Sequence, residues 1–105
     1  MNITLPATLN RIGASAFDGC ESLKEIEIPE GVTAIEDNTF RICESLTKIE
    51  IPEGVTAIGE YTFQSCLNLT DITLPAGLQS IGFGAFRYCT ALAEILVPEG
   101  VTYIG

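Results

Sequence analysis

Residues 49–69 read IEIPEGVTAIGEYTFQSCLNL, and this stretch recurs along the whole chain with a constant step of 23 residues. The step is marked by prolines at 6, 29, 52, 75 and 98, phenylalanines at 17, 40, 63 and 86, cysteines at 20, 43, 66 and 89, leucines at 23, 46, 69 and 92, and isoleucines at 3, 26, 49, 72 and 95. No residue is inserted or deleted between the copies. A fixed period of this length indicates a solenoid, in which each copy forms one coil and neighbouring coils stack.

Each copy predicts two short extended segments and one turn. In residues 23–28 (LKEIEI) apolar and polar side chains alternate at the end, which indicates a strand with one face inward. Pro29 has no N–H group and therefore lies at the margin of a β ladder. Residues 32–35 (VTAI) predict a second extended segment on the opposite wall. Phe40 and Cys43 are three residues apart, which predicts a single helical or 3₁₀ turn with one buried side.

The copies match the leucine-rich repeat type, whose signature combines a period of about 20–29 residues with the spacing L-x-x-I-x-I. One copy cannot bury its own apolar face, so stacking must place like side chains over like in columns. We therefore predict a right-handed leucine-rich repeat solenoid of β-rich α/β type. Short parallel strands form one wall, and short extended segments with helical or 3₁₀ turns form the other. Residues 1–105 are expected to form a single array of about four and a half repeats that lacks terminal caps.

The phrase I-x-I-P-x-G-V-x-x-I-G-x-x-x-F-x-x-C-x-x-L resembles the BspA-type, or Treponema-type, leucine-rich repeat family. It is carried by Ile49, Ile51, Pro52, Gly54, Val55, Ile58, Gly59, Phe63, Cys66 and Leu69, and by their equivalents one period away. The resemblance implies a large protein on the surface of bacteria or parasitic protists that acts in adhesion, host-matrix binding or aggregation. It implies a binding scaffold but no particular ligand, because these residues belong to the core. Two positions depart from the phrase, since Thr8 and Glu36 stand where other copies have glycine.

The charge balance restricts the partners. The 105 residues include 14 acidic and 5 basic residues and no histidine, for a net charge of −9. Nucleic acid and anionic membrane surfaces are unsuitable partners, because both need clustered lysine or arginine. No apolar run approaches the roughly 18 residues of a membrane span, and the N-terminus has no targeting segment. We expect a piece of a longer parent protein that is secreted or held at the cell surface.

The four cysteines allow three interpretations. A zinc site requires converging ligands, usually in C-x₂₋₄-C pairs, whereas a step of 23 residues places the thiols in a straight column. Disulfides between coils would need Cβ atoms about 3.8 Å apart, closer than the roughly 5 Å between parallel side chains on neighbouring coils. We therefore predict free, inert thiols that act as small buried hydrophobic groups.

Catalysis and cofactor binding are not predicted. Without histidine there is no Ser–His or Cys–His couple, and no phosphate-binding glycine loop is present. Acid pairs could serve a hydrolase, but a slab-like solenoid offers no deep cleft to desolvate them. We predict a protein that is not an enzyme and that binds no cofactor or metal.

The outward positions of the predicted strands are the candidates for partner binding. They are Glu25, Glu27, Lys48, Glu50, Asp71, Thr73, Glu94 and Leu96. Charges alternate in the column that begins with Glu25, which predicts weak cross-strand stabilisation, whereas Glu27 beside Glu50 is mildly unfavourable. Glu30 and Glu53 stack similarly at the turn. Two interpretations remain open: an acidic patch for a basic partner or a loosely held Ca²⁺, and a solvated face that keeps the chain soluble.

Three functions compete. The first is a protein-binding scaffold, a fragment of a bacterial cell-surface adhesion protein whose partners are host-matrix or other surface proteins. The second is end-to-end self-association through uncapped coils, which would give a homo-oligomer. The third, an enzyme, would require a pocket that the sequence does not predict. Variable apolar residues near the C-terminus fit either a contact site or the covering of a further coil; they are Phe83, Tyr88, Leu96 and Tyr103.

Overall fold

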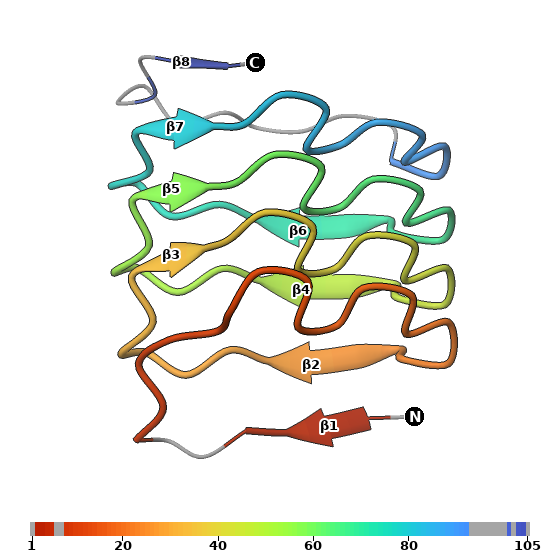
Figure 1. Ribbon diagram of the computed structural model, residues 1–105, viewed down its shortest axis with the longest axis horizontal. Helices are drawn as coiled ribbons and strands as arrows, with labels where there is room; N and C mark the ends of the chain where they lie inside the picture. Colours follow the sequence, from red (N-terminus) through yellow and green to blue (C-terminus); the bar gives the residue numbers. More distant parts are fainter. Residues whose placement is uncertain (1, 6–7, 93–100, 102, 105) are drawn as a thin grey trace.

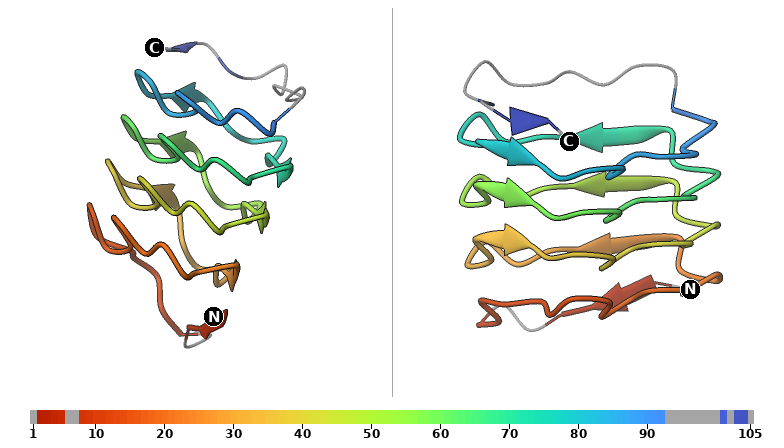
Figure 2. Two further views of the ribbon diagram at one scale, coloured as in Figure 1. Left: turned by 90° about the vertical axis from the view of Figure 1, so that its right-hand side faces the viewer. Right: turned by 45° about the horizontal axis from the view of Figure 1, so that its top comes forward.

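The computed structural model describes residues 2–5, 8–92, 101 and 103–104. This part of the chain contains eight short strands: β1 (Asn2–Thr4), β2 (Glu25–Glu27), β3 (Ala34–Ile35), β4 (Lys48–Glu50), β5 (Ala57–Ile58), β6 (Asp71–Thr73), β7 (Ser80–Ile81) and β8 (Tyr103–Ile104). They form two sheets, ordered β1-β2-β4-β6 and β3-β5-β7-β8. The chain crosses from one sheet to the other in each coil and rises as a right-handed solenoid (Figure 1). The two sheets lie on opposite sides of the stack (Figure 2), which confirms the predicted fold class.

The strands pair in parallel with a constant offset of one repeat. In the first sheet Ile3 pairs with Ile26. In the second sheet Ile35 pairs with Ile58, and Ile58 pairs with Ile81. This register follows directly from a period without insertions, because a slip would move apolar side chains to the wrong face. The predicted columns of like residues are confirmed.

Apolar side chains from both walls and from the turns fill the space between the sheets. Fully buried side chains include Leu23, Leu46, Leu69, Val32, Val55, Leu78, Ile35, Ile58, Phe40 and Phe63. The phenylalanine rings stack along the axis, with Phe17–Phe40 centroids 5.4 Å apart and Phe40–Phe63 centroids 5.5 Å apart. Burying each large apolar side chain contributes roughly 1.5–3 kcal/mol relative to exposure. Each coil therefore depends on its neighbours for its core.

The segment that carries phenylalanine and cysteine differs from the prediction of a helical or 3₁₀ turn. Within the described residues it contains no helix and consists of successive β-turns. The reason is that some of its N–H groups donate to carbonyls of the next coil, whereas others donate to carbonyls within the same turn. The Phe40 N–H donates to the Thr62 carbonyl of the next coil at 2.9 Å, whereas the Cys43 N–H donates back to the Phe40 carbonyl at 3.3 Å. A helix would use every donor inside the segment, so the bonds between coils exclude it.

Two positions in each of these turns have a left-handed backbone. The first is occupied in successive coils by Ser15, Asn38, Tyr61 and Gly84, and the second by Gly19, Ile42, Ser65 and Tyr88. Ile42 has a φ of 59°, which is rare for a β-branched residue. At Gly84 an added Cβ would lie 2.7 Å from the ring of Tyr61, so the absence of a side chain lets that ring pack across the backbone. The sequence does not reveal these positions, because most of them are not glycine.

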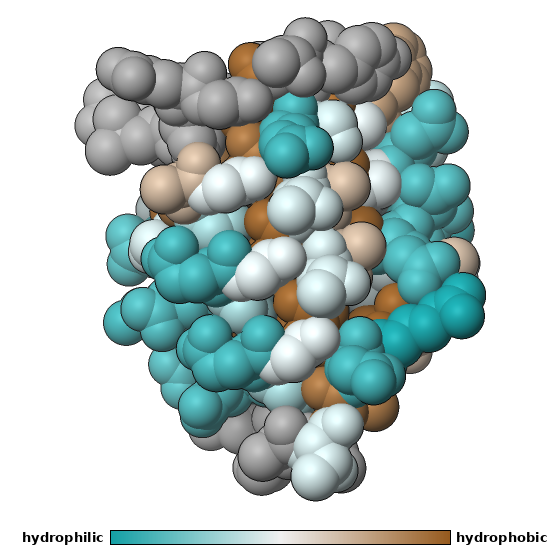
Figure 3. Space-filling view, turned by 90° about the vertical axis from the view of Figure 1, so that its left-hand side faces the viewer, coloured by the Kyte–Doolittle hydropathy of each residue, from teal (hydrophilic) through white to brown (hydrophobic). Residues whose placement is uncertain are grey.

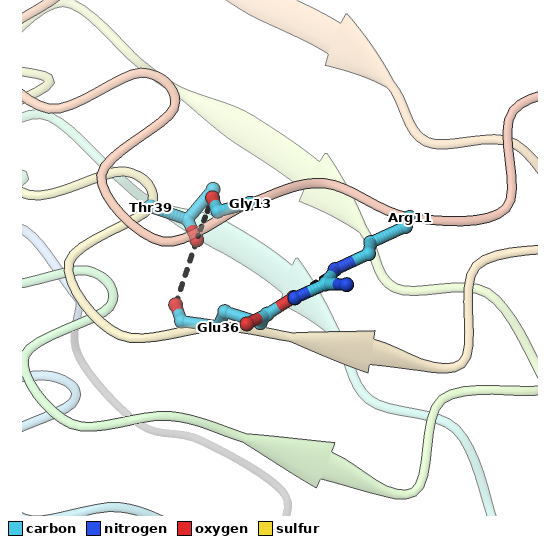
Figure 4. A network of polar contacts seen from close by, with 4 residues as sticks. All are labelled: Arg11, Gly13, Glu36 and Thr39. Carbon is cyan, nitrogen blue, oxygen red and sulfur yellow. Dashed lines mark hydrogen bonds and ion pairs between the residues drawn. The ribbon is translucent and has the colours of Figure 1, made fainter.

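Glu36, which replaces a repeat glycine, is accommodated by contacts between the first two coils (Figure 4). The Arg11 guanidinium donates to the Glu36 carboxylate at 3.1 Å. The buried Thr39 hydroxyl donates to the Glu36 backbone carbonyl at 2.7 Å, and the Gly13 carbonyl lies 3.4 Å from it. The departure therefore leaves the core columns intact, as predicted.

Candidate functional site

An open hollow of about 590 Å³ lies on the outward face of the sheet β1-β2-β4-β6, here called the strand face. The residues around it come from the coils that contain β2 and β4, with one residue from β6: Glu25, Ile26, Glu27, Ile28, Glu30, Lys48, Ile49, Glu50, Ile51, Pro52, Glu53 and Thr73. We call it the acidic hollow, because its lining includes five glutamates and a single lysine. It is a depression in the surface and not the deep cleft that a hydrolase would need to desolvate an acid pair.

Most of the candidate residues gather around this hollow. Glu25, Glu27, Lys48, Glu50 and Thr73 line it. Glu30 and Glu53 also line it, although the sequence places them at the turn. Their place in the sequence could have indicated this, because each follows the repeat proline directly and the proline lies close to the end of a strand.

The remaining candidates lie elsewhere. Asp71 is exposed at the start of β6 and pairs in register with Lys48. It is not among the residues that line the acidic hollow. Glu94 and Leu96 lie outside the residues that the structure describes.

Hydrophilic side chains lie on both walls of the solenoid, on either side of the edge where the chain turns from one sheet to the other. Figure 3 shows this edge as a pale central strip flanked by hydrophilic groups. The salt bridges found among the described residues are Arg11–Glu36 at 3.1 Å and Arg41–Asp18 at 3.0 Å, and neither lies on the strand face. The charged groups of the strand face are thus free of salt bridges within the described part of the chain.

The ladder of the strand face is uneven. β1 and β2 pair at three positions, including Thr4–Glu27, and β4 and β6 pair at three, including Glu50–Thr73. Between β2 and β4 pairing is confined to Glu25–Lys48. The ladder is therefore complete where glutamate meets threonine and interrupted where Glu27 would meet Glu50.

Magnitudes explain why such an interruption is feasible. Two like charges about 4 Å apart in water repel by about 1 kcal/mol. A backbone hydrogen bond contributes about 0.5–1.5 kcal/mol net to stability. The two terms are comparable, so like charges at one seam can offset the gain from closing the ladder there.

The thiols form the predicted column and are free in all four coils. Cys43 and Cys66 are buried, and Cys20 and Cys89 are half-buried. The Cys43, Cys66 and Cys89 Sγ atoms donate to the carbonyls of Phe17, Phe40 and Phe63 at 3.2, 3.1 and 3.0 Å. Each thiol therefore joins its coil to the preceding one, a role that the sequence interpretation as a small hydrophobic group missed.

Burial also suppresses the reactivity of these thiols. Desolvation, followed by the neighbouring Cys20, raises the pKa of Cys43 from 9.0 to about 12. Desolvation raises the pKa of Cys89 to about 11 and raises that of Cys66 as well. The thiolate is the nucleophile and the metal ligand, so these three groups are in their unreactive form at neutral pH. Among the described residues no three histidine, cysteine or acidic side chains are grouped closely enough to hold a metal ion.

Aromatic side chains are exposed in the coil that contains β7. Phe83 is 51% exposed and packs edge-on against Tyr61, with centroids 5.7 Å apart. Tyr88 is 55% exposed, and the Arg87 guanidinium lies 5.0 Å from its ring centre. The part of the chain that the structure describes contains no helix that could span a membrane.

Comparison with known proteins identifies a family that matches the chain and solved structures that resemble it. The family model described as "BspA type Leucine rich repeat region (6 copies)" matches residues 1–105. The chain is similar to a leucine-rich repeat protein of T. pallidum, with 32% identity and a TM-score of 0.95 over 99% of this chain and 51% of that one. It is also similar to a leucine-rich cell surface protein of Faecalibacterium prausnitzii, with 31% identity and a TM-score of 0.75 over 99% of this chain and 34% of that one. The chain thus spans about half of the first protein and about a third of the second. No match was found among the curated proteins.

Proposed function

The chain belongs to the BspA-type leucine-rich repeat family, and from this premise we propose that it is a protein-binding scaffold within a bacterial cell-surface adhesion protein. Its binding surface is the strand face, centred on the acidic hollow. The observation that carries the proposal is the difference between the repeated residues and the outward residues of the strand face. The repeated apolar residues are buried in the core, whereas the outward strand positions differ between coils: one column holds Glu25, Lys48 and Asp71, and the other holds Glu27, Glu50 and Thr73.

The chemistry of the hollow favours a basic partner. Five glutamates against one lysine attract a surface that carries arginine or lysine, and they disfavour an acidic one. The stacked core holds the strands of this face in place, so little ordering is needed when a partner binds. The cell-surface setting is supported by the similar protein of Faecalibacterium prausnitzii, which is described as a leucine-rich cell surface protein. Adhesion to host-matrix proteins is the role that the family resemblance favours.

A binding array tests the proposal. The chain and its full-length parent are exposed to immobilised host-matrix and bacterial surface proteins, and binding is measured at physiological salt. We expect binding to a basic protein that weakens at least tenfold when Glu27, Glu50 and Glu53 are all changed to Gln. The matched control changes Glu21, Glu44 and Glu60 to Gln, which alters the net charge equally but away from the hollow. Equal losses in the two triple variants, or an array that stays blank with the full-length parent, would contradict the proposal.

A second candidate function is self-association. It is favoured by the exposure of Phe83 and Tyr88, because large exposed aromatic side chains are common in protein contacts. Sedimentation measured from micromolar to millimolar concentration tests it. A dimer or longer array that dissociates when Phe83 is changed to Ser would support the idea, and a monomer across the whole range would rule it out.

A further inference from the structure

The β2–β4 seam, defined by the edges of β2 and β4 and the residues that follow each strand, is the place where the first sheet is interrupted. Pairing there is confined to Glu25–Lys48. In the next seam the equivalent ladder continues, and the Ile51 N–H donates to the Thr73 carbonyl at 3.0 Å. Ile28 stands one repeat before Ile51. The hydrogen bond that would continue the ladder in the β2–β4 seam is therefore one from the Ile28 N–H to the Glu50 carbonyl, beyond the paired residues.

Charge distinguishes this seam from its neighbours. The side chain beside Glu27 in the preceding coil belongs to Thr4, and the side chain beside Glu50 in the following coil belongs to Thr73. Both of those seams are fully paired. Within the described residues of this sheet, the β2–β4 seam is the one that would place two glutamates, Glu27 and Glu50, side by side. Glu30 and Glu53 lie at the adjoining turn. The paired end of the same seam joins opposite charges, Glu25 and Lys48.

The open part of the seam also lies under the acidic hollow. The hollow is lined from one side by Glu27 and Ile28 and from the other by Glu50 and Ile51. Glu27 and Glu50 are exposed, so ions and charged partners can reach them. Exposed charges are screened by salt, and their repulsion is weakened when either is neutralised.

We propose that the β2–β4 seam is a charge-controlled joint in the solenoid. Repulsion between Glu27 and Glu50 holds the ladder open beyond Glu25–Lys48. Screening or neutralisation of either glutamate closes it and extends pairing to Ile28. The proposal does not depend on which partner the strand face binds, although a partner that presents a cation to these glutamates would close the joint as it binds.

Amide hydrogen exchange measured by NMR on the full chain tests this directly, because the Ile51 N–H provides an internal reference. At low salt we expect the Ile28 amide to exchange about tenfold faster than the Ile51 amide. Changing Glu27 to Gln should slow exchange at Ile28 by about threefold to tenfold and leave Ile51 unchanged. Changing Glu50 to Gln should have the same effect from the other strand, and the double variant should add little, since either change removes the same repulsion.

Two controls separate the joint from a general gain in stability. Changing Glu25 to Gln removes an equal charge from the same strand but at the paired end, so exchange at Ile28 should not slow. Raising the salt from about 10 mM to about 0.5 M should slow Ile28 exchange in the parent and have little effect in the Glu27→Gln variant. The proposal fails if Ile28 exchanges as slowly as Ile51 in the parent at low salt. It also fails if the Glu25→Gln variant slows Ile28 as much as the Glu27→Gln variant does.

Discussion

The strand wall and the turn wall of this solenoid are built from the same 23-residue period but are constrained in different ways. The strand wall is the sheet β1-β2-β4-β6, and the turn wall consists of residues 13–22, 36–45, 59–68 and 82–91. On the strand wall the backbone is extended in every coil, although the ladder is interrupted between β2 and β4, and outward side chains can change without disturbing the core. On the turn wall phenylalanine, cysteine and threonine side chains contact the neighbouring coil, and the backbone is left-handed twice in each coil. Contacts between coils therefore constrain the side chains of the turn wall, whereas the outward positions of the strand wall are freer to vary, and these are the positions that we propose for binding.

Changing Phe63 to Ala should lower the stability of the turn wall more than any other change considered for it. Phe63 is fully buried and stacks between Phe40 and Phe86, with centroid distances of 5.5 Å on both sides. Its loss leaves a cavity at the centre of the turn wall, for which we expect a decrease in the free energy of unfolding of about 3–5 kcal/mol. Urea unfolding followed by circular dichroism measures it. The comparator is Asp71→Asn, at an exposed position of the strand wall outside the β2–β4 seam, which should change stability by less than about 0.5 kcal/mol. Similar losses in the two variants would contradict the comparison.

The thiol column predicts that stability falls at alkaline pH. The folded-state pKa is raised to about 12 for Cys43 and to about 11 for Cys89, and it is raised for Cys66, from an ordinary value of 9.0. The unfolded chain loses these protons first. The stabilisation is therefore fully present below pH 9 and is lost as the pH rises from there through the folded-state values.

At pH 10 each buried thiol that ionises only on unfolding lowers the free energy of unfolding by about 1.4 kcal/mol, and the half-buried Cys89 by less. The measurement compares urea unfolding at pH 8 and pH 10 for the parent and for Cys66→Ala. The variant should be less stable at pH 8 but should lose about 1 kcal/mol less between the two values. An equal pH-dependent loss in both proteins would show that Cys66 contributes nothing to it.

Changing Thr62 to Val should have a smaller effect on the same wall. Thr62 is fully buried, and its hydroxyl donates to the Gly59 carbonyl at 2.7 Å. Valine has nearly the same shape but leaves that carbonyl without its donor, so we expect a loss of about 1–2 kcal/mol. Thermal unfolding would show a decrease of roughly 4–8 °C in Tm per kcal/mol for a domain of this size. The control is Thr56→Val, at an exposed position directly before β5, where Tm should change little.

The contrast between the walls also explains what the sequence could predict. The coils, the parallel register and the columns of buried residues followed from a period without insertions, because like residues must then lie one above another. The outward charges of Glu27 and Glu50 followed from strand alternation. The path of the turn wall could not be predicted, since its alternating N–H bonds depend on the next coil and not on local sequence. The acidic hollow and the interrupted seam were missed for a similar reason: both depend on how two neighbouring coils pair, which the repeat pattern does not specify.

The smallest expected effect is a gain in stability at Ile42. Its φ of 59° costs roughly 1 kcal/mol for a residue with a Cβ, and more for a β-branched one, whereas asparagine tolerates this region. Ile42 is only half-buried and is not part of the packed core, so its side chain contributes little to offset that strain. We expect Ile42→Asn to raise the free energy of unfolding by about 0.5–1 kcal/mol, measured by urea unfolding. Ile42→Val keeps the branched Cβ and should give no gain, and neither should Thr33→Asn, at an exposed position without positive φ. If Ile42→Asn were destabilising, the Ile42 side chain would have to contribute more to packing than its exposure indicates, and the left-handed position would not be a source of strain that sequence changes on the turn wall can relieve.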